Sequence, residues 1–257
     1  MIEINHLYKS FENKDVLKDI STVFDKGKTN LIIGRSGSGK TVLMKSLIGL
    51  IRPTSGEILY DKRNLIVMNK SELKNLRREM GMLFQGSALF DSMTVLENVT
   101  FPLTMFTHDT LKVREKRAKF CLERVNLMDA DNLYPGEISG GMMKRVAIAR
   151  AIALNPEYLF CDEPNSGLDP KTALLIDDLI HDITKEYNMT TVINTHDMNS
   201  VMNIGEKIIF INEGIKAWEG TSNEIMSSTN KELNDFVFAS DLFKKVKEVE
   251  NSYNEEN

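Results

Sequence analysis

Eight residues near the N-terminus, from Gly34 to Thr41, have the types and spacing of a phosphate-binding loop. They read G-x-x-x-x-G-K-T, and the glycines let the backbone curl so that its N–H groups point inward. Such N–H groups, together with the positive end of a following helix dipole, form a cradle for anions. Lys40 can reach the outer phosphates, and the Thr41 hydroxyl can hold Mg²⁺. The residues predicted to contact a nucleoside triphosphate here are Gly34, Arg35, Ser36, Gly37, Ser38, Gly39, Lys40, Thr41 and Val42.

The segments that flank this loop favour phosphate binding over an ordinary glycine-rich turn. The apolar run at 31–33 predicts a buried strand before the loop. After the loop, apolar residues recur at helical spacing, namely Leu43, Leu47, Leu50 and Ile51. A loop between a buried strand and a helix is the context that this motif requires.

Two adjacent carboxylates, Asp162 and Glu163, follow the apolar run at 158–161, which is predicted to be another buried strand. There Asp162 can reach the Mg²⁺ shell, and Glu163 can orient or deprotonate an attacking water. A strand that merely ends in acids is the alternative, but the phosphate loop in the same chain favours catalysis. His196 and Gln85 also end predicted strands. His196 could hydrogen-bond the outermost phosphate, and Gln85 could contact the Mg²⁺ or the water.

A second element that can bind anions begins at Ser139. This serine is a good N-cap for the helix predicted to run from Gly140 to about 154, and Gly140 and Gly141 expose backbone N–H groups. We expect this element to face away from the phosphate loop. One ATP could then contact both only if two chains pair head to tail, and the twofold axis would create two identical composite sites. An ordinary helix cap is the alternative.

Other candidate contacts lie near these elements. The loop at 165–170, which contains Asp169, follows the acids directly and would lie at the same seam between chains. The ring of Phe11 could stack on the adenine, and Tyr8 is the less favoured candidate.

The elements that must position these residues fall into an α/β arrangement. Strand patterns at 2–4, 16–24 and 57–60 predict an N-terminal β region. Helical patterns dominate from about 86 to 154, and strand patterns return at 158–161 and 191–194 with a helix between them. A hairpin is expected around Asn212-Glu213-Gly214. The predicted division is a core of residues 1–85 and 155–225, a helical subdomain at about 86–154, and a partly helical extension at 226–257.

Composition sets limits on the class of protein. A chain of 257 residues with 42% hydrophobic residues is long enough to bury a large core without disulfides. The net charge of −5 argues against a nucleic-acid partner. The two cysteines, Cys121 and Cys161, have no metal-ligand spacing. No signal peptide and no run long enough to span a bilayer is expected, so a membrane role would go through a partner.

The ordered set of motifs resembles the nucleotide-binding subunit of ABC transporters over residues 1 to about 225. The set comprises Gly34–Thr41, Gln85, Ser139–Met142, Asp162-Glu163, Ser166–Asp169 and His196. The resemblance implies a RecA-like P-loop core with an inserted helical subdomain, and an ATPase that converts ATP and water to ADP and phosphate. It also implies two ATP molecules sandwiched in a homodimer. Ser139, Gly140, Gly141 and Met142 would complete the site of the opposite protomer, and Asp169 would contact across the seam.

Within this superfamily, the stretch at 84–99 is similar to the ATPase of Mla/Mce-type systems, which move phospholipids or other lipids between bacterial membranes. Met142 fits that subfamily too, whereas Ile138 replaces the usual leucine. The resemblance implies a peripheral motor subunit on the cytoplasmic face of the bacterial inner membrane. An integral-membrane permease would place a short helix in a groove near Gln85–Phe90. An Mce-type lipid-binding subunit and a small regulatory subunit are further implied partners.

The last predicted element is an amphipathic helix with Phe238, Leu242, Val246 and Val249 on one face. It could pack on its own domain or contact a partner.

Three other functions remain open from the sequence. The first is another ABC transporter, such as an amino-acid importer or a lipoprotein-releasing or macrolide-type system, with the same core chemistry. The second is a non-transport ABC ATPase that acts on ribosomes or DNA, which the single cassette and acidic balance disfavour. The third is a nucleotide kinase, which would need neither Ser139–Met142 nor His196.

Overall fold

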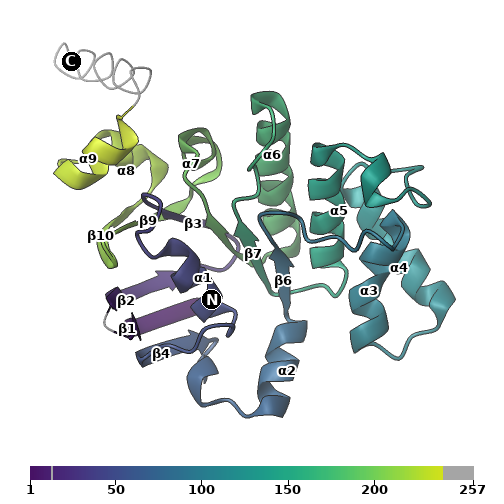
Figure 1. Cartoon of the computed structure of the whole chain (residues 1–257), viewed down its shortest axis with the longest axis horizontal. Coiled ribbons are helices and arrows are strands. Elements are labelled where there is room, and N and C mark those ends of the chain that lie inside the picture. The colour runs from purple at the N-terminus through teal and green to yellow at the C-terminus, as the bar shows by residue number, and fades with distance from the viewer. Residues whose placement is uncertain (13, 240–257) are drawn as a thin grey trace.

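The computed structural model describes residues 1–12 and 14–239. Within them, six strands form a central sheet in the order β10-β9-β3-β8-β7-β6 (Figure 1). β3, β6, β7, β8 and β9 run parallel, and β10 pairs antiparallel with β9 through a turn in which Glu213 and Gly214 have positive φ. The hairpin prediction is thus confirmed. The strands are β3 (Thr29–Ile33), β6 (Met80–Leu83), β7 (Tyr158–Asp162), β8 (Thr190–Asn194), β9 (Lys207–Asn212) and β10 (Ile215–Gly220).

Alternate residues of the central strands enter two separate hydrophobic clusters, one on each face of this sheet. On β3, Leu31 and Ile33 belong to one cluster and Ile32 to the other. On β8, Ile193 and Val192 divide in the same way. Burial on both faces explains why parallel strands read as continuous apolar runs in the sequence. Because β3, β7 and β8 run parallel, their carboxyl ends meet at the same edge of the sheet, and the polar residues that follow these strands gather there.

A second, antiparallel sheet packs on one of these faces, with the strand order β2-β1-β4-β5. Its first two strands are longer than predicted, because register shifts between Ile4 and Leu7 and beyond break the two-residue alternation. The sequence pattern therefore showed only the regular part of β1. The strands are β1 (Ile2–Phe11), β2 (Lys14–Phe24), β4 (Ser55–Tyr60) and β5 (Arg63–Asn64).

Three helices gather at the end of the molecule away from this second sheet (Figure 1). They are α3 (Val95–Phe106), α4 (Leu111–Arg124) and α5 (Gly140–Ile152). α3 begins with a capping box, in which the Thr94 hydroxyl accepts from the Glu97 N–H and the Glu97 carboxylate accepts from the Thr94 N–H. The buried side chains of all three helices share one cluster with a face of the central sheet. The predicted boundaries of a helical subdomain stay a prediction.

The remaining helices cover the two faces of the central sheet. α1 is shorter than the predicted pattern, since it ends at Leu47 and Leu50 is 58% exposed. Phe238 is buried in the main cluster, whereas Leu242, Val246 and Val249 lie outside the described residues. Among residues 1–12 and 14–239, none of the helices has the length and apolar character needed to cross a membrane. These helices are α1 (Lys40–Leu47), α2 (Lys70–Arg78), α6 (Pro170–Tyr187), α7 (Met198–Ile204), α8 (Ser222–Met226) and α9 (Lys231–Val237), with single 3₁₀ turns at Leu65–Val67 and Pro135–Glu137.

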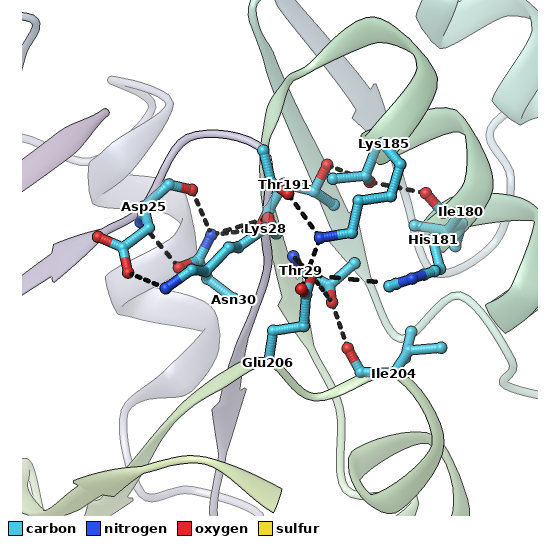
Figure 2. Close-up of polar contacts among 12 residues, drawn as sticks. Asp25, Lys28, Thr29, Asn30, Ile180, His181, Lys185, Thr191, Ile204 and Glu206 are labelled. Atoms are coloured by element: carbon cyan, nitrogen blue, oxygen red, sulfur yellow. Dashed lines mark hydrogen bonds and ion pairs between the residues drawn. The ribbon is translucent and has the colours of Figure 1, made fainter.

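A partly buried polar network holds the amino end of β3, the strand that leads into the phosphate loop (Figure 2). The Thr29 N–H donates to the Glu206 carboxylate at 2.9 Å, and the Lys185 ammonium donates to the same carboxylate at 2.5 Å. The Asn30 amide donates to the Thr191 carbonyl at 3.0 Å. Although burial opposes it, the hydrogen bonds from Lys185 and Thr29 lower the pKa of Glu206. Because β3 is held firmly here, its other end can position the loop.

The packing of β6 against α5 leaves no room for a side chain at Gly81. A Cβ there would lie 2.5 Å from the Ala151 carbonyl oxygen. We expect Gly81→Ala to lower the free energy of unfolding by about 1–3 kcal/mol, the usual cost of overpacking, as measured by chemical denaturation. Gly86→Ala is the matched control, because nothing lies within 4 Å of a Cβ at Gly86. It should change stability by less than about 1 kcal/mol. Equal effects of the two substitutions would contradict the close approach of β6 and α5.

Candidate nucleotide-binding site

The loop from Gly34 to Thr41 lies between β3 and α1, as predicted. Gly34 and Gly39 have φ of 149° and 111°, and neither position can hold a side chain. A Cβ on Gly34 would lie 2.2 Å from the Ile211 carbonyl oxygen. A Cβ on Gly39 would lie 2.9 Å from the Val16 carbonyl oxygen. The loop is therefore packed closely on β2 and β9 and has the conformation that only glycine adopts readily.

Lys40 folds back onto this loop. Its ammonium donates to the carbonyls of Gly34 and Arg35 at 2.7 and 3.0 Å. Burial lowers the pKa of Lys40, while the charges of Glu163 and Asp162 act in the opposite direction. In the sheet, β8 lies between β3 and β7 and runs parallel to both. The phosphate loop after β3 and the predicted catalytic acids at the end of β7 therefore lie at the same edge of the sheet.

The ends of β7 and β8 place the acidic and histidine side chains together. Asp162 is the last residue of β7 and accepts from the Asn194 amide at 2.5 Å. The Glu163 N–H donates to the Asn194 carbonyl at 2.8 Å, and Glu163 has a positive φ of 50°. Nδ1 of His196 lies 2.7–2.8 Å from the carboxylate oxygens of Glu163. Asn194 was missed in the sequence, although it stands two residues before His196 at the same strand end.

Gln85 lies two residues beyond the end of β6 and is exposed. Its backbone carbonyl accepts a hydrogen bond from the buried Lys144 of α5. Arg150, also on α5, donates to the carbonyls of Ser87 and Ala88 at 2.7 Å each. Both of those residues have positive φ, of 62° and 49°. Lys144 and Arg150 therefore hold a strained loop. Their role could not be predicted from sequence, because their partners are main-chain carbonyls.

Ser139 caps α5 as predicted, since its hydroxyl accepts from the Met142 N–H at 3.3 Å. It lines a hollow together with Gly140, Gly141 and Asp169, and among the described residues none of that lining comes from 34–41. A Cβ on Gly141 would lie 2.7 Å from Cγ2 of Thr172, so the starts of α5 and α6 are in close contact. The hollow at the predicted second anion-binding element is thus not lined by the phosphate loop of the same chain.

Asp169 and Phe11 occupy exposed positions. The Asp169 carboxylate caps α6 and accepts from the Lys171 and Thr172 N–H groups at 3.1 Å each. Its hydrogen bonds with Thr172 lower its pKa. Phe11, the last residue of β1, is 43% exposed, and Nζ of Lys9 lies 4.5 Å from its ring centroid. Its contact with adenine and the contact of Asp169 across a dimer stay predictions.

The donor set fits a triphosphate that carries Mg²⁺. The described residues contain no group of three or more His, Cys, Asp or Glu side chains that could hold a metal by themselves. Thr41 and Asp162 would supply two oxygen ligands, and Mg²⁺ commonly takes its others from phosphate and water. The buried Oγ of Ser38 and Oδ1 of Asn194 have no hydrogen-bond partner in the described part of the chain. These orphaned polar atoms are suited to a polar ligand.

The family model described as "ABC transporter" matches residues 17–166. The chain belongs to the ABC transporter family. It is an ATP-binding cassette, and as such it is an ATPase. The solved ATP-binding cassette MJ0796 superposes on this chain with a TM-score of 0.79 at 33% sequence identity. The match covers 86% of this chain and 99% of that one, which was solved as a dimer in a post-hydrolysis state bound to ADP and Pi. The ABC ATPase fold is thus confirmed.

Curated relatives of the cassette differ in what their names say they transport. The methionine import ATP-binding protein MetN of Carboxydothermus hydrogenoformans is 40% identical over 88% of this chain and 67% of its own length. The probable ribonucleotide transport ATP-binding protein mkl of Mycobacterium tuberculosis is 40% identical over 77% of this chain and 55% of its own. The intermembrane phospholipid transport system ATP-binding protein MlaF of Haemophilus influenzae is 35% identical over 92% of this chain and 90% of its own length. The cassette spans only about half of mkl and two thirds of MetN.

Proposed function

We propose that the cassette is the ATP-hydrolysing motor of a transporter that moves lipid, specifically phospholipid, across the bacterial cell envelope. The observation that carries this proposal is where the Mla/Mce-like stretch at 84–99 lies. Phe84, Ala88 and Phe90 from this stretch line an apolar groove between the central sheet and the helices α3 and α5. The likeness to lipid-transport ATPases therefore falls on a surface suited to a membrane partner. The likeness to MlaF supports the same assignment.

In the proposed mechanism the phosphate loop and Lys40 bind the triphosphate, and Thr41, Gln85 and Asp162 would hold Mg²⁺. When bound there, Mg²⁺ would supply positive charge against the charge that develops on the phosphates. Glu163 accepts a proton from the attacking water, and the nearby His196 hydrogen-bonds the outermost phosphate. The adenine stacks on Phe11.

Two copies of the cassette pair head to tail in this mechanism. Ser139, Gly140, Gly141 and Met142 of one copy then contact the ATP of the other, and Asp169 contacts across the seam. In each chain the Ser139 element and the phosphate loop line separate places, so a second copy is needed to complete each site. ATP binding closes the pair, and hydrolysis with product release reopens it.

The permease is proposed to dock in the apolar groove, whose volume is about 490 Å³. Phe90 and Phe101 both line it and pack on each other, with ring centroids 4.7 Å apart. The buried Asn98 holds the Phe90 backbone through two hydrogen bonds, at 2.8 and 3.1 Å. The groove also includes Arg150, which holds the loop that follows Gln85. A helix seated in the groove would thus be coupled to the predicted Mg²⁺ contact.

Phe90→Glu tests this docking. Phe90 is 40% exposed, and a charge at this position should be tolerated by the fold but not by an apolar partner. We expect the variant to lose at least about tenfold in co-purified permease, since a buried unpaired charge costs more than 1.4 kcal/mol. The ATPase rate of the isolated cassette should stay within about twofold. Phe120→Glu on α4 is the matched control, because Phe120 is 42% exposed and lies outside the groove. Equal recovery of permease with both variants would refute the docking site.

The transported molecule is tested by gentle affinity purification of the tagged cassette from membranes, with proteins and lipids identified by mass spectrometry. A permease with an Mce-type lipid-binding subunit, phospholipid and a small regulatory subunit would support the proposal and the assignment to the cytoplasmic face of the inner membrane. A permease with a soluble solute-binding protein and no lipid would instead support an amino-acid importer. The 40% identity to MetN makes that importer the second candidate.

A further inference from the structure

A buried carboxylate outside the predicted motifs lies directly beneath the loop that follows Glu163. Asp177, on α6, is 1% exposed and falls on the buried stripe of that helix with Ala173, Ile176 and Ile180. The helical period would predict an apolar side chain at this position. In the part of the chain that the structure describes, no lysine, arginine or histidine forms an ion pair with it. A buried, unpaired carboxylate is costly, so its hydrogen bonds need an explanation.

Those hydrogen bonds join three segments of the chain. The Asn165 amide donates to Oδ1 of Asp177 at 2.7 Å and to Oγ of Ser200 at 2.9 Å. Asn165 belongs to the loop after β7, Asp177 to α6, and the buried Ser200 to α7. Burial raises the pKa of Asp177 to about 6, and its hydrogen bonds with Ser200 and Asn165 act against that rise. At neutral pH the carboxylate is therefore mostly ionised and depends on both donors.

The segments joined in this way are the ones that carry the predicted catalytic side chains. Glu163 stands two residues before Asn165, and His196 stands four residues before Ser200, just ahead of α7. The contact of 2.7–2.8 Å between Glu163 and His196 spans the same two segments. Glu163 also has a positive φ, a conformation that persists only where the surroundings hold it. A fixed point at Asn165 supplies such a constraint.

We propose that Asp177 is a positioning residue for ATP hydrolysis. It anchors Asn165 against Ser200 and thereby keeps Glu163 and His196 at hydrogen-bonding distance from each other. The inference rests on the proposed roles of Glu163 and His196. It assigns no contact between Asp177 and the nucleotide. Its consequence is that loss of the anchor should affect the chemical step and leave binding of ATP at the phosphate loop largely unchanged.

The test compares steady-state kinetics of full-chain variants. We expect Asp177→Leu to lower kcat by about tenfold or more, because small misplacements of catalytic groups are costly, with KM for ATP within about threefold. Asp177→Asn keeps an oxygen that can accept from Asn165 and should retain kcat within about threefold. Asp182→Leu, at an exposed position further along α6, is the matched control and should stay within about twofold. A purely structural role would not separate kcat from KM in this way.

Asn165→Ala keeps the inference testable if Asp177→Leu fails to fold. It should lower kcat to the same extent, and the double variant should be no slower than either single variant, since both remove one anchor. A kcat within twofold of wild type for Asn165→Ala and every folded Asp177 variant, or fully additive losses in the double variant, would overturn the inference. Glu163→Gln, measured in parallel, separates the two proposals. If the kcat of Glu163→Gln is near that of wild type, the proposed mechanism fails. If Glu163→Gln is slow while the Asp177 and Asn165 variants are not, only the proposed anchor fails.

Discussion

Replacing Glu163 by glutamine is expected to slow steady-state ATP hydrolysis by at least about hundredfold, the range for loss of a general base. Glutamine keeps the shape of the side chain and can still hydrogen-bond with His196, which lies 2.7–2.8 Å away. It cannot accept a proton from water. The dissociation constant for ATP should therefore stay within about threefold, because the loss falls on the transition state rather than on binding.

This variant should also accumulate ATP-bound dimers. If ATP binding closes two copies and hydrolysis reopens them, a cassette that binds but does not hydrolyse remains closed. Size-exclusion chromatography with Mg-ATP would show the dimer. Glu157→Gln is the control, because Glu157 is exposed and directly precedes β7, at the end of the strand opposite Glu163. Turnover by Glu163→Gln close to the wild-type rate would remove Glu163 from the role of base.

The candidate site could be predicted largely because its motifs are local in sequence. The phosphate loop needs glycines at fixed spacing between a strand and a helix, and each part leaves its own pattern within a few residues. Asp162 and His196 could be placed for a related reason. Parallel strands buried on both faces show as apolar runs, and the polar residues after them must meet at one edge of the sheet. Side chains distant in sequence could thus be assigned to one place.

The residues that support the site could not be predicted in this way. Lys144 and Arg150 donate to main-chain carbonyls of the loop after β6, and any residue type offers such a carbonyl. Asp177 contacts Asn165 across a helix–loop packing that no short pattern encodes. In the fold, the length of β1 was underestimated because its bulges break the alternation of burial. The length of α1 was overestimated because Leu50 continues the helical spacing beyond the end of the helix.

The transported molecule is a different kind of problem, because ATP chemistry is shared by cassettes that serve different permeases. The relatives named for methionine import and for phospholipid transport are both similar to this chain. Specificity for cargo therefore has to enter through the permease. In this chain the proposed place of contact with the permease is the groove lined by Phe84 and Phe90. That is why a charge placed in the groove tests the partner and not the chemistry.

Replacing Lys40 by alanine is expected to raise the dissociation constant for Mg-ATP by roughly ten- to hundredfold, since a hydrogen bond to a charged group contributes about 1.5–3 kcal/mol. Among the described residues, the ammonium donates hydrogen bonds to the Gly34 and Arg35 carbonyls, at 2.7 and 3.0 Å. Phosphate oxygens would be stronger partners for a cation than these neutral carbonyls. Isothermal titration calorimetry measures the change directly.

Lys45→Ala separates the loss of this contact from a general loss of positive charge. Lys45 lies in the last turn of the same helix and is exposed, so its removal should leave affinity within about twofold at physiological salt, where distant charges are screened. The two variants have the same net charge and differ only in which ammonium is removed, the one that faces the loop or the one that does not. Unchanged affinity in Lys40→Ala, or equal losses in both, would contradict the cradle. A loss confined to Lys40→Ala would locate the phosphates at the carboxyl end of β3.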